Sequence, residues 1–223
     1  MGFLMTFEGV EGCGKSTQMG LLKGYLEKKG KDVLCVREPG GTLLGERIRA
    51  ILLNSCGEKV DPWAELFLYE ASRAQLVNSV IKPALDTGKT VICDRFTDST
   101  TAYQGYGRGL DIEAVESINR LASAGLKPSL TIMLDCPAEV GLKRAFLRIE
   151  SSASEAGAGA GGREDRFEKE EIDFHRRVRE GYLEIAKKEP GRIKVINADR
   201  EVRVIHREIC GLVESLPAAG TSL

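Results

Sequence analysis

Short apolar runs recur along the chain between longer stretches in which apolar residues follow a helical spacing. The runs are FLMTF from Phe3, DVLCV from Asp32, TVIC from Thr90, LTIML from Leu130 and IKVI from Ile193. Partly β-branched runs of this length are typical of buried strands. Strands that alternate with helices form parallel sheets covered on both faces. We therefore predict a three-layer α/β fold with a mostly parallel, five-stranded sheet flanked by helices.

Two helix starts carry clear capping signals. Asp61 is followed by Pro62, and Asp111 precedes a helical pattern that runs toward Ala124. Aspartate is a good N-cap and proline suits the first helical position. Pro83 is expected to bend or end the helix that begins near Pro62, because proline lacks a backbone donor. The length of 223 residues allows one sizeable core, so we expect a single domain spanning 1–223.

Residues 151–162 read SSASEAGAGAGG and differ from the rest of the chain. They offer no large apolar side chain for burial and too much glycine for a stable helix. Composition alone favours a flexible linker or surface insertion. The alternative is a mobile lid at about 148–168, because arginines flank the segment and lids over phosphates need both mobility and cations. The flanking arginines are Arg144, Arg148, Arg163 and Arg166.

Composition excludes several classes of protein. The 32 Lys and Arg residues nearly balance the 33 Asp and Glu residues, which gives no reason to expect a nucleic acid polymer or an anionic membrane as partner. Six cysteines without a C-x-x-C pair and only two histidines argue against a metal cluster and suggest reduced thiols in the cytoplasm. We also expect no leader and no membrane span, since no apolar run approaches about 20 residues.

The stretch FEGVEGCGKSTQ, Phe7 to Gln18, contains the phosphate-binding pattern G-x-x-x-x-G-K-[ST]. It lies between a predicted strand that ends at Gly9 and a helical pattern that begins at Lys15, which is the context that the pattern requires. Such a loop holds a polyphosphate with its backbone amides, while Lys15 reaches the β- and γ-phosphates and the Ser16 hydroxyl can bind Mg²⁺. A chance glycine-rich turn is the alternative. The expected ATP-binding residues here are Gly9, Val10, Glu11, Gly12, Cys13, Gly14, Lys15, Ser16 and Thr17.

The loop predicts a P-loop NTPase-type fold but leaves the kind of P-loop protein open. A guanine-nucleotide switch protein normally carries N-K-x-D, which is absent here. An ATP-driven binding protein without a small acceptor is a second possibility. Cys13 fills a position that needs a small residue, and a reactive thiol is the alternative for it, because helix N-termini lower thiol pKa values.

Several further motifs follow in a fixed order. They are REPGGTLLGERIR from Arg37, YEASRAQ from Tyr69, DRFTDSTTAYQGYGRG from Asp94, SLTIMLDCPAEVGLKR from Ser129 and DRFEKEEIDFHRRVREGYLEIA from Asp165. Together with the phosphate loop, this set resembles bacterial thymidylate kinases across nearly the whole chain. The sequence departs most from that family in the alanine- and glycine-rich segment before Arg163, which leaves the register of the lid arginines open.

The resemblance implies ATP-dependent phosphorylation of dTMP to dTDP, with Mg²⁺, in a homodimer formed through packed helices. We expect direct in-line transfer of the γ-phosphoryl group without a phosphoenzyme. The acceptor phosphate is already anionic, so the protein's task is positioning and charge neutralisation rather than strong base catalysis. A kinase for another small acceptor nucleotide and a non-catalytic ATP-dependent binding protein remain as alternatives.

Three arginines lie at or near the carboxyl ends of predicted strands, where ligands collect in open α/β sheets. They are Arg37, Arg49 and Arg95. The planar guanidinium suits phosphate oxygens, although a single arginine is more often a solvated surface charge. For Arg95 the phosphate role is favoured, because VICDRF places it at the end of a buried strand. The resemblance implies that Arg95 binds the acceptor phosphate and that Asp94 lies near the magnesium.

Tyr69 and Arg73 are four residues apart in a helical pattern and share one face. Helix packing explains such a pair equally well. The resemblance implies instead that Tyr69 stacks on thymine and that Arg73 bonds a ring carbonyl. It also implies that Tyr103 favours deoxyribose over ribose at C2′. The remaining expected dTMP contacts are Glu38, Pro39, Thr100 and Gln104.

The phosphate loop carries VEG without an arginine at its tip, so the catalytic cation must come from elsewhere. The resemblance implies that the lid supplies it from Arg148, Arg163 or Arg166. Glu11 is either a solvated acid or, as the resemblance implies, a carboxylate that contacts the acceptor's 3′-hydroxyl and orients arginines. Arg144, Asn197 and Ala198 are expected at the adenine. His175 lies in an arginine-rich helical pattern that suggests no chemistry.

Overall fold

A computed structural model of the chain describes residues 2–53, 59–156, 166–167 and 170–215, with the backbone alone for 151–156. Its sheet has five strands, all parallel, in the order β2-β3-β1-β4-β5. The strands are β1 Phe3–Glu8, β2 Val33–Arg37, β3 Thr90–Asp94, β4 Leu130–Asp135 and β5 Ile193–Asn197. The predicted α/β sheet is confirmed, and each apolar run forms a strand within one residue of its expected bounds.

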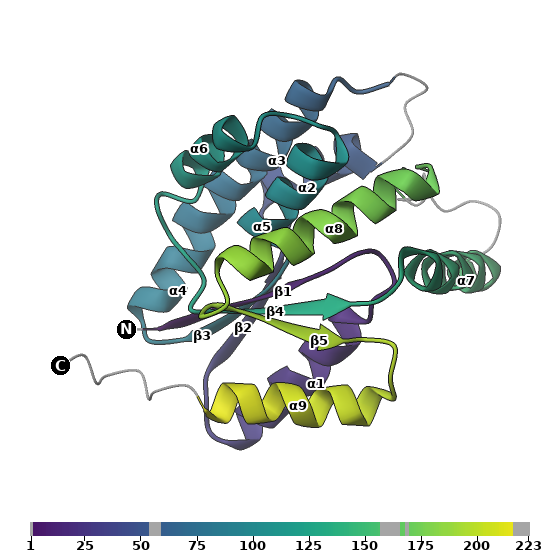
Figure 1. The fold of residues 1–223 in the computed structure, drawn as a ribbon. Helices are drawn as coiled ribbons and strands as arrows, with labels where there is room; N and C mark the ends of the chain where they lie inside the picture. Colours follow the sequence, from purple (N-terminus) through teal and green to yellow (C-terminus); the bar gives the residue numbers. More distant parts are fainter. Residues whose placement is uncertain (1, 54–58, 157–165, 168–169, 216–223) are drawn as a thin grey trace.

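Helices cover both faces of this sheet. Figure 1 shows α1 and α9 on one face and α8, α5 and α4 on the other, with α7 beyond the carboxyl end of β4. The helices are α1 Lys15–Lys28, α2 Leu43–Leu53, α3 Pro62–Leu76, α4 Lys82–Asp86, α5 Thr97–Thr100, α6 Ile112–Ala122, α7 Ala138–Ala156, α8 Ile172–Lys188 and α9 Val202–Glu214. Two π-helical segments, η1 Val77–Ile81 and η2 Thr101–Gly107, interrupt or extend them.

The two faces of β1 bury different side chains because successive residues of a strand alternate in direction. Met5 and Phe7 belong to the larger apolar cluster, which includes residues of α1 and α9. Leu4 packs in a second cluster with η1 and α4. Thr6 and Glu8 share the direction of Leu4, so the strand points two polar residues into the layer under α5 and α8. Both are fully buried.

The expected helix starts are confirmed, and of the two effects expected of Pro83, a bend or an end of the helix, the structure rules out the end. Asp61 accepts from the Trp63 amide at 2.9 Å, and Asp111 accepts from the Ala114 amide at 2.8 Å. The helix that begins at Pro62 continues through η1 and ends at Asp86. The wide turn immediately before Pro83 shifts the register of the backbone hydrogen bonds, and the helix therefore accommodates the proline ring.

Much of the predicted lid falls outside the residues that the structure describes. Its first part, from Arg148, belongs to α7, and residues 166–167 precede α8. In the described part of the chain, no helix is both long enough and apolar enough to cross a membrane. The described cysteines are free, with no disulfide among them.

Candidate nucleotide site

The phosphate loop connects β1 to α1 at the carboxyl edge of the sheet, where open α/β folds place their ligands. Gly9 and Gly12 have positive φ angles of 131° and 67°. A Cβ atom on Gly9 would lie 2.3 Å from the Leu134 carbonyl oxygen, and one on Gly12 would lie 2.0 Å from that of Gly141. The loop therefore packs its backbone directly against β4 and α7, which only glycine permits at these two positions.

Lys15 lies across this loop and is buried. Its Nζ donates to the carbonyl oxygens of Gly9 at 3.0 Å and Val10 at 2.9 Å, and lies 3.5 Å from Cys13 Sγ. Cys13 is itself only 2% exposed. Because thiol reactivity requires access, this burial favours the packing role of Cys13 over a reactive thiol.

A cavity of about 460 Å³ opens beside the loop, within the size range of small-molecule sites. It brings together most of the residues that the sequence predicted for donor and acceptor. These are Glu11, Gly12, Gly14, Lys15, Ser16, Thr17, Arg37, Glu38, Pro39, Arg49, Tyr69, Arg73, Asp94, Arg95, Thr100, Tyr103, Gln104, Arg144 and Arg148. Gly9, Val10 and Cys13 lie behind its surface. Leu53, Ser99 and Phe167 line the cavity without having been predicted.

Arg95 is held by hydrogen bonds from both ends of its guanidinium. Nη1 donates to Ser99 Oγ at 3.3 Å and to the Tyr182 hydroxyl at 3.1 Å. Nη2 donates to Glu11 Oε1 and to the Tyr103 hydroxyl, each at 3.0 Å. Its backbone is left-handed, with φ of 69°, which is rare outside glycine. The surrounding contacts thus fix both the backbone and the side chain of the arginine at the end of β3.

Glu11 is an organised carboxylate rather than a solvated acid, since its side chain is only 10% exposed. Tyr103 donates to Oε1, and His175 Nδ1 lies 3.3 Å from Oε2. Burial raises the pKa of this carboxyl, but His175, Arg95, Lys15 and Tyr103 together outweigh burial and hold the pKa well below its ordinary value. The arginine-rich pattern around His175 did not indicate this contact, for which the His175 ring is fully buried beside Glu11 of the phosphate loop.

Arg73 is almost fully buried, at 1% exposure, and most of its N–H groups donate to side chains from several elements. Nε donates to Glu38 Oε2 at 2.7 Å, Nη1 to Asn119 Oδ1 at 2.7 Å and Nη2 to Thr100 Oγ1 at 3.0 Å. Glu70 forms a second ion pair with it. Burial raises the pKa of Glu38 to about 7 although Arg73 opposes this rise. The guanidinium is rigidly oriented at the wall of the cavity.

Aromatic rings surround the part of the cavity next to Arg73. The Phe167 ring lies 6.4 Å from that of Tyr69 and 5.7 Å from that of Tyr103. Gln104, in the same wall, donates to Glu65 Oε1 at 2.7 Å. Such an aromatic slot with fixed polar groups suits a planar, hydrogen-bonding ring.

The residues predicted for the adenine are only partly brought together. Arg144 lines the cavity, and it donates to the Ala198 carbonyl oxygen at 3.3 Å and to Asp199 Oδ1 at 2.8 Å. Asn197 and Ala198 do not line this cavity. Asn197 Oδ1 instead accepts from the Asp199 amide at 2.8 Å, which closes a turn after β5.

The three predicted lid arginines differ in their placement. Arg148 lines the cavity. Arg166 does not, because it donates to the Leu52 carbonyl oxygen at 2.6 Å and pairs with Glu65 in a neighbouring pocket. Arg163 lies outside the described residues.

Oxygen atoms suitable for a divalent cation lie beside the loop. Ser16 Oγ is 3.5 Å from Asp94 Oδ2, and the buried Oδ1 of Asp94 has no hydrogen-bond partner among the described residues. Within the same residues, no group of three or more His, Cys, Asp or Glu side chains could hold a metal. A hydroxyl and one carboxylate fit Mg²⁺, which keeps waters and binds through substrate phosphates rather than a protein cage.

Three residues that organise the site were missed, and each had a signal. Glu8 is a charged residue at the end of an apolar strand, directly before the phosphate loop. His175 and Tyr182 are seven residues apart on α8, two helical turns, among the buried residues of that helix. Polar residues inside an apolar stripe indicate buried hydrogen bonds, but the sequence does not say to which partner.

A phosphate loop at the end of β1 that shares one cavity with a set of fixed arginines defines a P-loop nucleotide-binding protein of the kinase class. The family profile described as thymidylate kinase matches residues 7–209. The chain belongs to the thymidylate kinase family.

Relatives with the same description cover nearly the whole chain. Thymidylate kinase of Geotalea daltonii is 54% identical over 202 residues, covering 91% of this chain and 92% of the relative. That of Geotalea uraniireducens is 50% identical over 220 residues, covering 99% and 100%. The crystal structure of thymidylate kinase from Ehrlichia chaffeensis has 34% identity and a TM-score of 0.73, covering 95% of this chain and 98% of that one.

Proposed function

We propose that this protein transfers the γ-phosphoryl group of ATP to the 5′-phosphate of dTMP, giving ADP and dTDP. One observation carries the proposal: a single cavity joins the phosphate loop to Arg95 on one side and to Tyr69 and Arg73 on the other. The protein can thus hold two anionic nucleotides end to end. Membership of the thymidylate kinase family supports dTMP as the acceptor.

On the donor side, the loop amides and the N-terminus of α1 hold the ATP phosphates. Lys15, close to the loop carbonyls in this structure, turns to the β- and γ-phosphates. Arg148 is the lid arginine best placed to neutralise charge on the transferred group, because it already lines the cavity. Arg144 and the turn at Asn197 and Ala198 lie where the adenine would rest.

On the acceptor side, Arg95 donates to the dTMP phosphate, with Arg37 and Arg49 nearby in the same wall. Tyr69 stacks on the thymine, Phe167 lines the same cavity, and Arg73 donates to a ring carbonyl. Glu11 orients Arg95 and lies within the cavity near the sugar. Tyr103, which lines the same cavity, restricts the space at the C2′ atom of the dTMP sugar.

The reaction needs alignment more than it needs a base, because the attacking phosphate oxygen is already negatively charged. Fixed arginines and Lys15 offset the repulsion between the two anions and the charge that spreads in the transition state. Mg²⁺, held by Ser16 and near Asp94, supplies further neutralisation of the ATP phosphates when bound. Closure of the expected lid over the cavity would exclude water, which would otherwise receive the phosphoryl group.

We further propose that the protein acts as a homodimer in the cytoplasm. Large apolar side chains are exposed on α2, α3 and α6, namely Leu43, Leu44, Ile51, Trp63, Phe67 and Leu121. A group of this kind on adjacent helices is typical of a protein interface. Free cysteines in the described part of the chain suit a reducing compartment.

A coupled assay of ADP release across a panel of nucleoside monophosphates tests the function. We expect the highest kcat/KM with dTMP. A higher value with another monophosphate would favour the alternative of a kinase for a different acceptor. ATP binding without transfer to any acceptor would favour a non-catalytic binding protein.

A further inference from the structure

Glu8 is the last residue of β1 and precedes the phosphate loop, yet it does not line the cavity. It shares the face of Leu4 and Thr6 and is fully buried under α5 and α8. A carboxyl in such a position is costly unless donors surround it. The hydrogen-bond donors around Glu8 therefore indicate what its buried carboxyl does.

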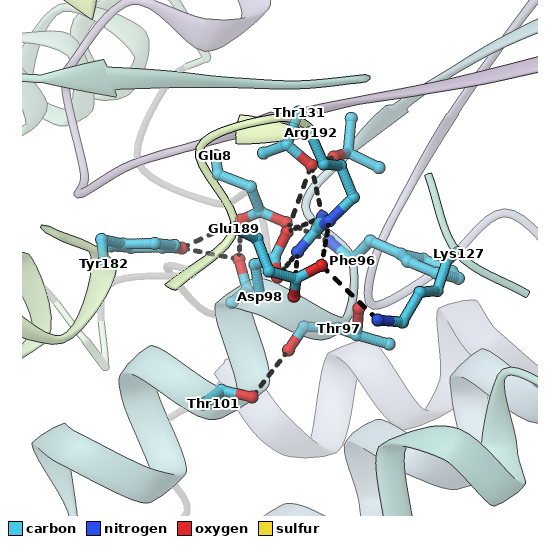
Figure 2. A network of polar contacts seen from close by, with 12 residues as sticks. Glu8, Phe96, Thr97, Asp98, Thr101, Lys127, Thr131, Tyr182, Glu189 and Arg192 are labelled. Carbon is cyan, nitrogen blue, oxygen red and sulfur yellow. Dashed lines mark hydrogen bonds and ion pairs between the residues drawn. The ribbon is translucent and has the colours of Figure 1, made fainter. Parts of the chain in front are cut away.

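Three donors converge on the Glu8 carboxyl. The Phe96 amide donates to Oε1 at 2.7 Å, and the hydroxyls of Ser99 and Tyr182 donate to Oε2 at 2.5 and 3.0 Å. The two hydroxyl oxygens are also 2.7 Å apart. Figure 2 shows Tyr182 reaching Glu8 from α8, on the opposite side from the Arg192 contacts.

The same two hydroxyl oxygens accept from Nη1 of Arg95. A hydroxyl carries one proton, so it presents a lone pair to Arg95 only while its proton is directed elsewhere. An ionised carboxyl accepts and never donates, and it therefore directs both protons away from the guanidinium. Chains of this kind also strengthen one another inside a protein.

Glu8 fixes the backbone of the arginine as well. Its bond to the Phe96 amide holds the residue directly after Arg95. Arg95 has left-handed φ, a conformation that needs support from its surroundings in a non-glycine residue. The Glu8 carboxyl thus stabilises both the backbone turn after β3 and the side chain of Arg95, which lies in that turn.

We propose that Glu8 is a positioning residue for the acceptor phosphate, acting through Ser99 and Tyr182 to aim the Arg95 guanidinium. The inference rests on the proposed function, because it concerns the acceptor side of that reaction. Glu8 itself touches no substrate in this arrangement. Its effect falls on acceptor binding and alignment and leaves ATP binding unchanged.

The charges around Glu8 make this role depend on pH. Asp98 on α5 faces it as a second carboxyl, and it is paired with Arg192, which also binds Glu189. Arg95 is the facing cation and Tyr182 the facing phenol.

Burial first, and then Asp98, raise the pKa of Glu8 to about 7, although Ser99, Arg95 and the Phe96 amide oppose the rise. Protonation would let the carboxyl donate to one of the two hydroxyls, and it would then compete with Arg95 for the lone pairs of that oxygen.

Glu8→Gln tests the proposal because it keeps the shape and replaces an accepting oxygen with a donating amide. At about pH 8, where Glu8 is mostly ionised, we expect the KM for dTMP to rise about tenfold and the KM for ATP to stay within about twofold. The Kd for dTMP, from calorimetry, should rise in parallel. Unchanged dTMP constants, or equal losses for both nucleotides, would overturn the proposal.

The ratio of wild-type to Glu8→Gln kcat/KM for dTMP, followed with pH, gives a second readout. The phosphate of dTMP also titrates, with a pKa near about 6, but this ionisation is common to both proteins and cancels in the ratio. We expect the ratio to fall toward one as pH drops through about 7. A ratio independent of pH would count against the role of the ionised carboxyl.

Tyr182→Phe provides a second variant that removes one hydroxyl from Arg95 without changing the ring. We expect it also to raise the KM for dTMP. In the double variant with Glu8→Gln, the KM for dTMP should rise by less than the product of the two single fold-changes, because both residues act on one chain of hydrogen bonds. Independent, multiplying effects would oppose the proposal.

Asp98→Asn is the matched control, since it makes the same carboxyl-to-amide change in the same buried cluster. Asp98 bonds Arg192 and Thr131 and not the hydroxyls that hold Arg95. We expect lower thermal stability with the dTMP KM within about twofold of wild type. Thr131→Val replaces this control if Asp98→Asn does not fold. A dTMP effect as large as that of Glu8→Gln would overturn the proposal. Absence of any transfer by the wild-type protein would instead refute the proposed function.

Discussion

At the scale of single residues, Lys15 and Arg73 show how differently a cation can be held in one cavity. Lys15 bonds only backbone carbonyls and lies near one sulfur, all within its own loop. Arg73 lies between Glu38 and Glu70 and bonds side chains from other elements. Loss of Lys15 therefore leaves no buried charge unpaired, whereas loss of Arg73 leaves two.

Lys15→Ala should abolish most turnover while the fold stays intact. We expect kcat to fall by at least about a hundredfold, because the role proposed for the lysine is to neutralise charge on the transferred phosphoryl group. Steady-state kinetics with a far-ultraviolet circular dichroism melt measures both effects. Lys23→Ala, an exposed change later on α1, is the control and should leave kcat unchanged. A fully active Lys15→Ala protein would contradict the donor site.

Arg73→Ala should weaken dTMP use and also destabilise the protein. The loss of a base contact raises the KM for dTMP, and breaking a buried ion pair costs about 3–5 kcal/mol. Chemical denaturation and the Kd values of both nucleotides separate the two effects. Arg200→Ala, which breaks a partly exposed pair with Glu208, should do neither. Equal losses in dTMP and ATP affinity by folded Arg73→Ala would refute its role at the base.

At the scale of elements, the phosphate loop and α7 meet through two glycines. A Cβ on Gly141 would lie 2.4 Å from the Glu11 carbonyl oxygen, as one on Gly12 would press on Gly141. The helix that carries Arg144 and Arg148 is therefore in close backbone contact with the phosphate loop, which we propose holds the ATP phosphates. Small shifts of α7 reach the donor site directly.

Gly141→Ala should accordingly raise the Kd for ATP several-fold, because the loop must move to admit the methyl group. Isothermal calorimetry with a non-hydrolysable ATP analogue measures the change. Gly24→Ala on α1 is the matched control, since an added Cβ there meets nothing within 4 Å. It should stabilise the protein by about 0.5–1 kcal/mol and leave ATP binding alone. Unchanged ATP affinity in Gly141→Ala would mean that the loop does not depend on this contact.

Much of the element-level structure could be predicted because its signals are local. Apolar runs mark the strands, and Asp61 and Asp111 mark helix starts without any tertiary information. The continuation past Pro83 could not be predicted, because a π-helical turn depends on packing. Nor could the contact between His175 and Glu11, since the position of His175 among the buried residues of α8 indicates burial but not the residue it packs against.

At the scale of the whole molecule, the sequence predicted the cavity better than the contacts behind it. Residues at the carboxyl ends of strands converge by topology alone, so Arg37, Asp94 and Arg95 were predictable. The Glu8 and Tyr182 contact joins positions 174 residues apart and follows from how α8 crosses the sheet. Pairings of this kind require the three-dimensional fold.

The same buried carboxyls predict how stability depends on pH. The pKa values of Glu8 and Glu38 are raised by burial from an ordinary 4.5 to about 7. Between these values the folded state holds more protons than the unfolded state, so the free energy of unfolding falls as pH rises. The loss is up to about 3 kcal/mol for each carboxyl. Glu11, whose pKa is lowered, acts in the opposite sense and loses its stabilising effect below its ordinary 4.5.

Denaturation by urea at several values between about pH 5 and about pH 8 should therefore show stability decreasing across this range. The variants Glu8→Gln and Glu38→Gln should each flatten the slope, since each removes one titrating group. If the free energy of unfolding instead rises from pH 5 to pH 8, and neither variant changes that slope, the pKa values of Glu8 and Glu38 are not raised as described.

The concentration of cations in one cavity has a further consequence for how substrates arrive. The molecule as a whole carries a net charge of only −1, while Lys15, Arg95 and Arg148 line the cavity. At physiological salt, ions screen exposed charges beyond about 8 Å. An approaching nucleotide is thus not guided from a distance and experiences attraction only at the mouth. Capture is set by diffusion and by the orientation in which the nucleotide reaches that opening.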